Sequence, residues 1–153
     1  MTKGNLLLVD DETLILDRLK VILDDKADKI FIASSGPSAL ELLNSQTIHC
    51  VICDISMPKM TGIEVIKAIR KKNNNVPFIF YTAYGNQAMM MEALKYGAFD
   101  FLCKPNLEGL EEIVTKGLKE GLNQKVTKEE NKKNYVSEYQ VLLEKMGSNN
   151  KID

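Results

Sequence analysis

The sequence of 153 residues predicts an α/β fold, in which a doubly wound parallel sheet carries helices on both faces. Short apolar segments alternate with helical stretches five times along the chain. These segments lack the alternation of polar and apolar residues that marks a half-solvated sheet, so both faces are covered. The links between them are short, as in parallel strands joined by right-handed helical crossovers.

The apolar segments identify the strands. The predicted strands are Asn5–Val9, Lys29–Ala33, Cys50–Cys53, Phe78–Tyr81 and Phe101–Cys103.

Between and after the strands, apolar residues recur at helical spacing. Ser35, Gly36 and Pro37 are start signals for the second helix, and Gly97 suits the end of the fourth. The five predicted stripes contain Ile15, Leu16, Leu19, Ile22 and Leu23; Ala39, Leu40, Leu42 and Leu43; Ile63, Ile66 and Ile69; Ala93 and Leu94; and Leu110, Ile113, Val114 and Leu118.

We expect this domain to cover residues 4–122 and residues 123–153 to form an extension. Residues 123–134 are polar and read as a solvated helix or a linker. An amphipathic helix follows and a disordered end is expected from Gly147. This helix has three open roles: packing on its own domain, pairing in a homodimer, or beginning a lost output module. Its apolar face contains Tyr135, Val136, Tyr139, Leu142, Leu143 and Met146.

The composition is that of an ordinary globular protein, with 44% hydrophobic and 27% charged residues. A formal net charge of -1 gives no electrostatic reason to expect binding to nucleic acid or to an anionic membrane. Apolar runs of four or five residues fall far short of the roughly 20 that span a bilayer. The N-terminus leads straight into a strand without a signal-peptide core, so we expect a cytoplasmic location.

Three other features have structural explanations. Cys50 and Cys53 form a C-x-x-C pattern inside a predicted strand, where they point to opposite faces, so buried and unreactive thiols are expected. His49 is expected at the surface. The run Met89–Met91 spans too much of a helix to be wholly buried, so it combines core packing with a possible methionine-rich contact surface.

Polar residues follow four of the five predicted strands: Asp10 and Asp11 the first, Asp54 the third, Thr82 the fourth and Lys104 the fifth. The carboxyl ends of parallel strands share one edge of the sheet, so these side chains are expected to meet there. Converging carboxylates need a counter-charge, which a hard cation such as Mg2+ and Lys104 can supply. Taken alone, the Asp10-Asp11 pair also fits a helix cap. The whole pattern predicts a site for a divalent metal and a phosphoryl group.

The sequence resembles the receiver domain of two-component response regulators. The motifs that carry the resemblance are Asp10-Asp11, residues 54–62, Thr82-Ala83 and Lys104-Pro105, in order and at the spacing of the family. The resemblance implies a flavodoxin-like, CheY-like (βα)5 fold with strand order 2-1-3-4-5. Gly62 is expected to permit a backbone geometry that other residues resist.

The resemblance also implies a chemical role for the acidic residues. Asp54 would accept a phosphoryl group from a histidine kinase or a phosphotransfer protein. Mg2+ would be bound by the side chains of Asp11 and Asp54 and by the Ser56 carbonyl, with Asp10 contributing through water. The bond before Pro105 is cis in the family, which would direct the preceding lysine into the site.

The family resemblance also implies a conformational change on phosphorylation. Thr82 and Lys104 would bind the phosphoryl oxygens, and Thr82 would vacate space for Phe101, which lacks the hydroxyl of a tyrosine. The face formed by the fourth helix, the fifth strand and the fifth helix would then signal to a downstream protein effector. Ser56 and Tyr84 occupy positions that tune the phosphoryl lifetime in the family. They favour opposite outcomes, so no lifetime is predicted.

Two other functions remain to be separated from this one. A Mg2+-dependent phosphatase of the haloacid-dehalogenase type would also use Asp54 as nucleophile, but such enzymes place a second aspartate where this chain has Ser56. A constitutive interaction module would never be phosphorylated. The favoured reading is a self-modifying signalling switch and not a turnover enzyme.

Overall fold

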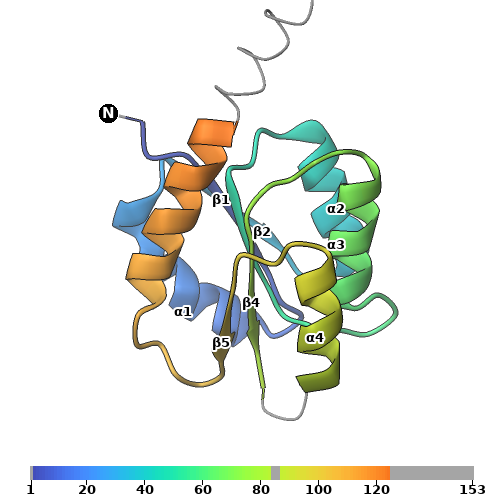
Figure 1. Cartoon of the computed structure of the whole chain (residues 1–153). Helices are drawn as coiled ribbons and strands as arrows, with labels where there is room; N and C mark the ends of the chain where they lie inside the picture. Colours follow the sequence, from blue (N-terminus) through green and yellow to red (C-terminus); the bar gives the residue numbers. More distant parts are fainter. Residues whose placement is uncertain (1, 84–86, 125–153) are drawn as a thin grey trace, which may run out of the picture. The chain divides into compact units, whose positions relative to one another are not determined.

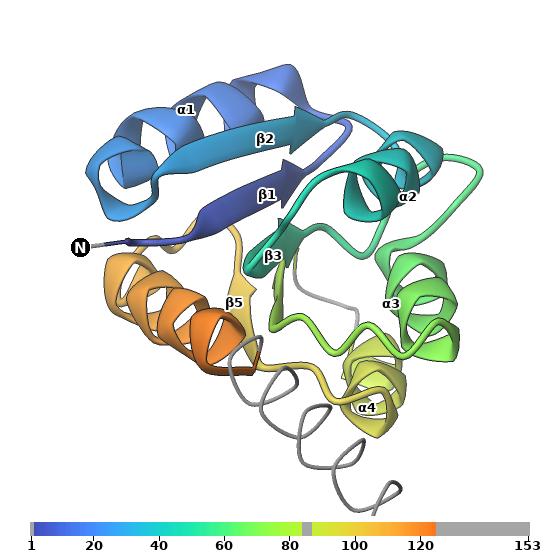
Figure 2. The same ribbon diagram turned by 90° about the horizontal axis from the view of Figure 1, so that it is seen from above.

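The computed structural model describes residues 2–83 and 87–124, and the fold lies in the compact unit Met1–Leu122. A parallel sheet lies between two helical layers (Figures 1 and 2). Tyr84 and all but the first two residues of the extension predicted for residues 123–153 lie outside the described residues, and residues 123 and 124 still belong to the last described helix. The assignments outside the described residues therefore stay predictions.

The sheet contains five parallel strands in the order β2-β1-β3-β4-β5, which confirms the predicted fold class and strand order. Two strands are one residue longer than predicted, because Thr82 pairs with Cys103 and Asp100 pairs with Ile79. Thr82 is thus the last residue of its strand and does not follow it. The strands are β1 (Asn5–Val9), β2 (Lys29–Ala33), β3 (Cys50–Cys53), β4 (Phe78–Thr82) and β5 (Asp100–Cys103).

The helices cover both faces of the sheet. Helix α1 and the helical segment 110–124 lie on one face, and α2, α3 and α4 lie on the other (Figure 2). No helix in the described part of the chain is long and apolar enough to cross a bilayer. The elements are α1 (Thr13–Leu23), the 3-10 turn η1 (Asp24–Lys26), α2 (Gly36–Ser45), α3 (Gly62–Lys71) and α4 (Gln87–Lys95).

Local signals set several helix ends. The Ser35 hydroxyl caps α2 by accepting a hydrogen bond from the Ser38 amide at 3.3 Å, and Thr61 caps α3 in the same way. Gly97 follows α4 with a φ of 73°, a left-handed conformation that glycine adopts without steric cost. Residues at the ends of these helices therefore determine where α2 and α3 begin and where α4 ends.

Side chains of each strand alternate between two buried clusters. In β1, Leu7 and Val9 pack towards α2 and α3, whereas Leu6 and Leu8 pack towards α1. The two strand cysteines divide in the same way, as predicted, and burial raises the pKa of the Cys50 thiol to about 12. Since thiolates are the reactive form, neither a redox nor a zinc role is supported.

His49 is buried, with 8% of its surface exposed, so the expectation of a surface histidine was wrong. Its Nδ1 accepts a hydrogen bond from the Asn5 amide at 2.8 Å. A Cβ at Gly121 would collide with the His49 carbonyl oxygen, so segment 110–124 passes close to this end of β3. The partner is a backbone amide supplied by strand pairing, which residue spacing does not reveal.

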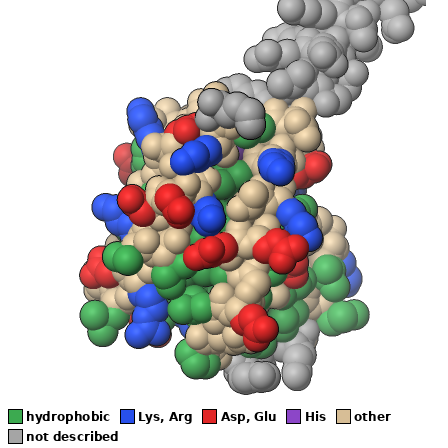
Figure 3. Space-filling model, turned by 90° about the vertical axis from the view of Figure 1, so that its left-hand side faces the viewer, with side chains coloured by type: hydrophobic (Ala, Val, Ile, Leu, Met, Phe, Trp, Pro, Cys, Tyr) green, Lys and Arg blue, Asp and Glu red, His purple; other side chains and the backbone are tan. Residues whose placement is uncertain are grey.

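Figure 3 shows the face built by α1 and segment 110–124. Described acidic and basic side chains are interspersed over this face, consistent with the near-zero net charge of the chain. This pattern gives no electrostatic argument for a polyanionic partner on this face.

Candidate functional site

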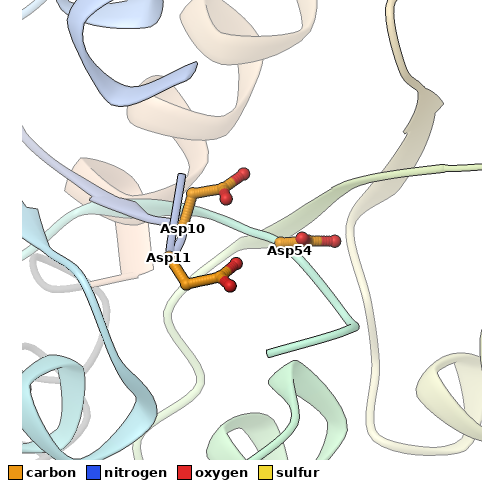
Figure 4. Close-up of side chains that lie close together, drawn as sticks. All are labelled: Asp10, Asp11 and Asp54. Atoms are coloured by element: carbon orange, nitrogen blue, oxygen red, sulfur yellow. The ribbon is translucent and has the colours of Figure 1, made fainter. Parts of the chain in front are cut away.

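The carboxyl ends of β1 and β3 bring three predicted carboxylates together (Figure 4). One oxygen from each of Asp10, Asp11 and Asp54 lies within 4.8 Å of the others. The Asp54 amide donates to the Val9 carbonyl at 3.0 Å, and the Asp10 amide donates to the Ala33 carbonyl at 3.2 Å. Sheet hydrogen bonds therefore fix the backbone from which these side chains project.

Lys104 supplies the positive charge next to the buried carboxylates. Its Nζ lies 2.8 Å from Asp10 Oδ2 and 3.1 Å from Asp54 Oδ2, and its side chain is only 12% exposed. Burial acts to lower the pKa of Lys104, but the hydrogen bonds to Asp10 and Asp54 together with the negative charges of these two carboxylates raise it overall. The Lys104–Pro105 peptide bond is cis, in agreement with the resemblance.

The two buried carboxylates differ in their surroundings. Burial raises the pKa of Asp10, although hydrogen bonds from Lys104 and from the Glu12 amide act in the opposite direction. Asp10 Oδ1 accepts the Glu12 amide at 2.9 Å, and Asp54 Oδ1 accepts the Ser56 amide at 3.4 Å. Each carboxylate thus has one oxygen towards the backbone and one towards Lys104.

The loop after β3 approaches the start of α3 very closely. A Cβ at Gly62 would collide with the Asp54 carbonyl oxygen, and the Gly62 amide donates to the Ile55 carbonyl at 2.9 Å. Lack of space explains this glycine, whereas the left-handed residue of the loop is Lys59, with a φ of 68°. The missing side chain at Gly62 lets α3 begin close against the backbone of Asp54.

The two predicted switch residues lie on adjacent strands. Thr82 is fully buried at the end of β4, and its carbonyl accepts the Lys104 amide at 2.8 Å. Phe101 in β5 is half-buried and stacks on Phe80, with ring centroids 5.7 Å apart and an interplanar angle of 16°. Ring packing therefore positions Phe101, which has no hydroxyl for a hydrogen bond.

Comparison with known protein families matches residues 6–116 to the response regulator receiver domain. The chain belongs to this family. Among curated proteins, it is 32% identical to the transcriptional regulatory protein FixJ of Bradyrhizobium diazoefficiens, over 68% of this chain and 51% of FixJ. It is 36% identical to the transcriptional regulatory protein ZraR of Escherichia coli, over 77% of this chain and 27% of ZraR. The chain thus spans about half and about a quarter of these relatives.

Among solved structures, the receiver domain is similar to the response regulator TrrA of Thermotoga maritima in complex with Mg(2+)-BeF. The TM-score is 0.67 at 34% identity, and the match covers 75% of this chain and 99% of TrrA. Sequence and structure comparisons therefore agree on a receiver domain of two-component systems.

One neighbour of the receiver's lysine was not identified from the sequence. The ring of Tyr81, the residue before Thr82, lies with its centroid 5.9 Å from Lys104 Nζ. Tyr81 reads as an ordinary strand residue, and nothing in its spacing shows that the long lysine side chain reaches it. Only the packed arrangement of β4 and the Lys104 side chain places the ring beside the ammonium.

The acidic cluster of the receiver has the donor chemistry of a magnesium site. All three of its grouped ligand atoms are carboxylate oxygens, and Asp11 is exposed while Asp10 and Asp54 are buried. Mg2+ prefers oxygen ligands and keeps several of its waters, so a partly open cluster suits it. The residues present therefore fit this cation.

Proposed function

We propose that this receiver domain is a phosphorylation-dependent switch in which Asp54 accepts a phosphoryl group from a histidine kinase or a phosphotransfer protein. The observation that carries the proposal is the buried Asp54 carboxylate, 3.1 Å from the Lys104 ammonium and grouped with two further carboxylates. A carboxylate oxygen would form the new O–P bond as the P–N bond of phosphohistidine breaks. The released imidazole keeps that electron pair and takes up a proton.

Mg2+ would be held by the side chains of Asp11 and Asp54 and by the Ser56 carbonyl, with Asp10 contributing through water. When bound, the ion would neutralise charge on the phosphoryl oxygens. The Mg(2+)-BeF complex of TrrA supports this choice of metal. The Ser56 side chain is exposed beside Asp54, a place from which it would influence how long the phosphoryl group persists. We assign Tyr84 the same tuning role on the family resemblance alone.

Lys104 would bind a phosphoryl oxygen, since its ammonium already forms an ion pair with the Asp54 carboxylate. The Thr82 hydroxyl would bind another, and Phe101 would repack in response. Changes at Phe101 would alter the face formed by α4, β5 and segment 110–124, which would bind a downstream protein effector or a second copy of the chain. FixJ and ZraR are transcriptional regulatory proteins, which supports an effector in gene regulation.

Two alternatives make different chemical demands. A haloacid-dehalogenase-type phosphatase would need a second acid at position 56, where this chain has Ser56. A constitutive interaction module, which is never phosphorylated, would not require a buried lysine paired with Asp10 and Asp54. We therefore favour the switch, which modifies itself and does not turn over a free substrate. The cytoplasmic location stays a prediction.

The test is the intact mass of the full chain after incubation with acetyl phosphate and Mg2+. One added phosphoryl group is expected in the wild type and none in Asp54→Asn or in the presence of EDTA. Light scattering on the same samples would show whether phosphorylation produces a homodimer. A wild-type chain that gains no mass and does not bind beryllofluoride would overturn the proposal, and steady release of phosphate from phosphomonoesters would favour the phosphatase.

A further inference from the structure

Three groups that lie close to the Lys104 ammonium bear on its position. Two are the carboxylates of Asp10 and Asp54, at 2.8 and 3.1 Å. The third is the ring of Tyr81, with its centroid 5.9 Å from Nζ. A cation within about 6 Å of an aromatic face is attracted by the electron-rich ring, and exclusion of water strengthens the attraction.

Tyr81 is firmly fixed by the fold. It lies in β4, pairs in register with Leu102 of β5, and is only 3% exposed. Its ring belongs to the buried cluster that contains Leu8 and Leu16, on the α1 side of the sheet. A rigid ring in the central part of the sheet is well suited to hold the end of a long and flexible side chain.

The three neighbours differ in what happens to them during the proposed reaction. Asp54 becomes an acyl phosphate, and Asp10 contributes to the proposed metal site, so both carboxylates change their interactions. The Tyr81 ring takes no part in bond formation and stays the same before and after transfer. It is therefore the one of the three that can hold the ammonium in both states.

We propose that Tyr81 is a positioning residue for phosphoryl transfer, acting through Lys104. This inference rests on the proposed function of Asp54. The ring restricts the lysine to conformations in which its ammonium lies at the reacting carboxylate, and this reduces the entropy lost when the ammonium must meet a phosphoryl oxygen. The ring and not the hydroxyl performs this role.

The competing explanation is that Tyr81 only fills the core. A double-mutant cycle separates the two, using the full chain as wild type, Tyr81→Leu, Lys104→Met and the double variant. The rate of phosphorylation by acetyl phosphate is followed by intact mass at fixed Mg2+. Tyr81→Phe keeps the ring, and Ile79→Ala shortens a fully buried side chain of β4 in the same cluster as Tyr81.

We expect Tyr81→Leu to slow phosphorylation about fivefold and Tyr81→Phe to change it less than about twofold. In the Lys104→Met background, Tyr81→Leu should cause no further loss, because the residue through which it acts is gone. Ile79→Ala should leave the rate unchanged. Equal slowing by Tyr81→Leu in both backgrounds would mean a purely structural role and would overturn the inference, as would an unchanged rate in the single variant.

A second measurement does not depend on the reaction. In the free protein, the methylene protons beside the Lys104 ammonium should show a ring-current shift by NMR that Tyr81→Phe keeps and Tyr81→Leu abolishes. Absence of this shift in the wild type would overturn the inference. A wild type that shows the shift but is not phosphorylated would instead overturn the proposed function.

Discussion

At the scale of single residues, Asp10 combines a structural role with a place in the site. Its Oδ1 accepts the Glu12 amide in a local turn just before α1, while its Oδ2 binds Lys104. The helix-cap interpretation of the Asp10-Asp11 pair was therefore wrong, because Glu12 is the N-cap residue of α1 and no side chain caps the helix. Burial raises the pKa of Asp10, so its carboxylate depends on a nearby positive charge.

Replacement of Lys104 tests that dependence. We expect Lys104→Met to bind Mg2+ more tightly than the wild type, by about threefold to tenfold, because the metal would no longer compete with an ammonium for Asp10 and Asp54. Isothermal titration calorimetry at constant ionic strength measures the affinity. Lys67→Met is the matched control, since Lys67 pairs with Glu92 at 2.6 Å between α3 and α4. Unchanged or weaker binding in Lys104→Met would contradict the expectation.

At the scale of elements, Arg70 joins the end of α3 to two neighbouring loops. Its guanidinium donates to the carbonyls of Tyr96 at 2.7 Å, Asn74 at 2.8 Å, Val76 at 3.0 Å and Gly97 at 3.4 Å. These loops lead into β4 and β5, the strands that carry Thr82 and Phe101. One side chain therefore satisfies backbone acceptors that strand pairing leaves without a partner.

Loss of these hydrogen bonds should destabilise the fold. We expect Arg70→Met to lower the free energy of unfolding by about 2–4 kcal/mol, since several half-buried carbonyls lose a charged donor. Urea denaturation measures this loss. Lys71→Met, at an exposed position one residue later in α3, is expected to change stability by less than about 0.5 kcal/mol. Equal stability of the two variants would show that the Arg70 contacts contribute little.

The same scale shows which elements a sequence can predict. Apolar segments identified the described strands. The inner strands β3 and β4 are apolar because they are buried on both faces, whereas the edge strand β2 is largely exposed or half-buried and so departs from the expected double coverage. Strand ends were less certain: Thr82 and Asp100 are polar, and only pairing with the neighbouring strand brings them into the sheet. His49 was misplaced for a similar reason, because its partner is the amide of Asn5, 44 residues away.

At the scale of the whole molecule, the site was predictable because topology brings the strand ends together. Asp10, Asp11, Asp54 and Lys104 converge as expected from their positions after parallel strands. The order of the strands came from the family resemblance, since periodicity alone does not specify it. The ring of Tyr81 beside the lysine was not predictable, because side-chain reach depends on packing.

Metal binding should stabilise the whole fold, because the unfolded chain does not assemble the three carboxylates. At ten times its Kd, Mg2+ would add about 1.4 kcal/mol and raise the Tm by roughly 3–6 °C. Thermal denaturation followed by circular dichroism measures the shift, with KCl at equal ionic strength as the control. In Asp11→Asn the shift should disappear, because one of the three carboxylates of the proposed metal site is lost. Asp11 is exposed, so its replacement leaves the buried Lys104 pairs intact. A shift equal to that of the wild type would exclude Asp11 as a ligand.

The close passage of Gly121 along the His49 carbonyl has a consequence for how such domains can evolve. His49 precedes β3, whereas Asp54 follows it, so segment 110–124 runs to the edge of the sheet opposite the acidic cluster. Genetic fusion after this segment would thus leave the acidic cluster and its neighbours untouched. One receiver domain can in this way be fused to many different C-terminal segments, and each fusion would connect the same site to a different output.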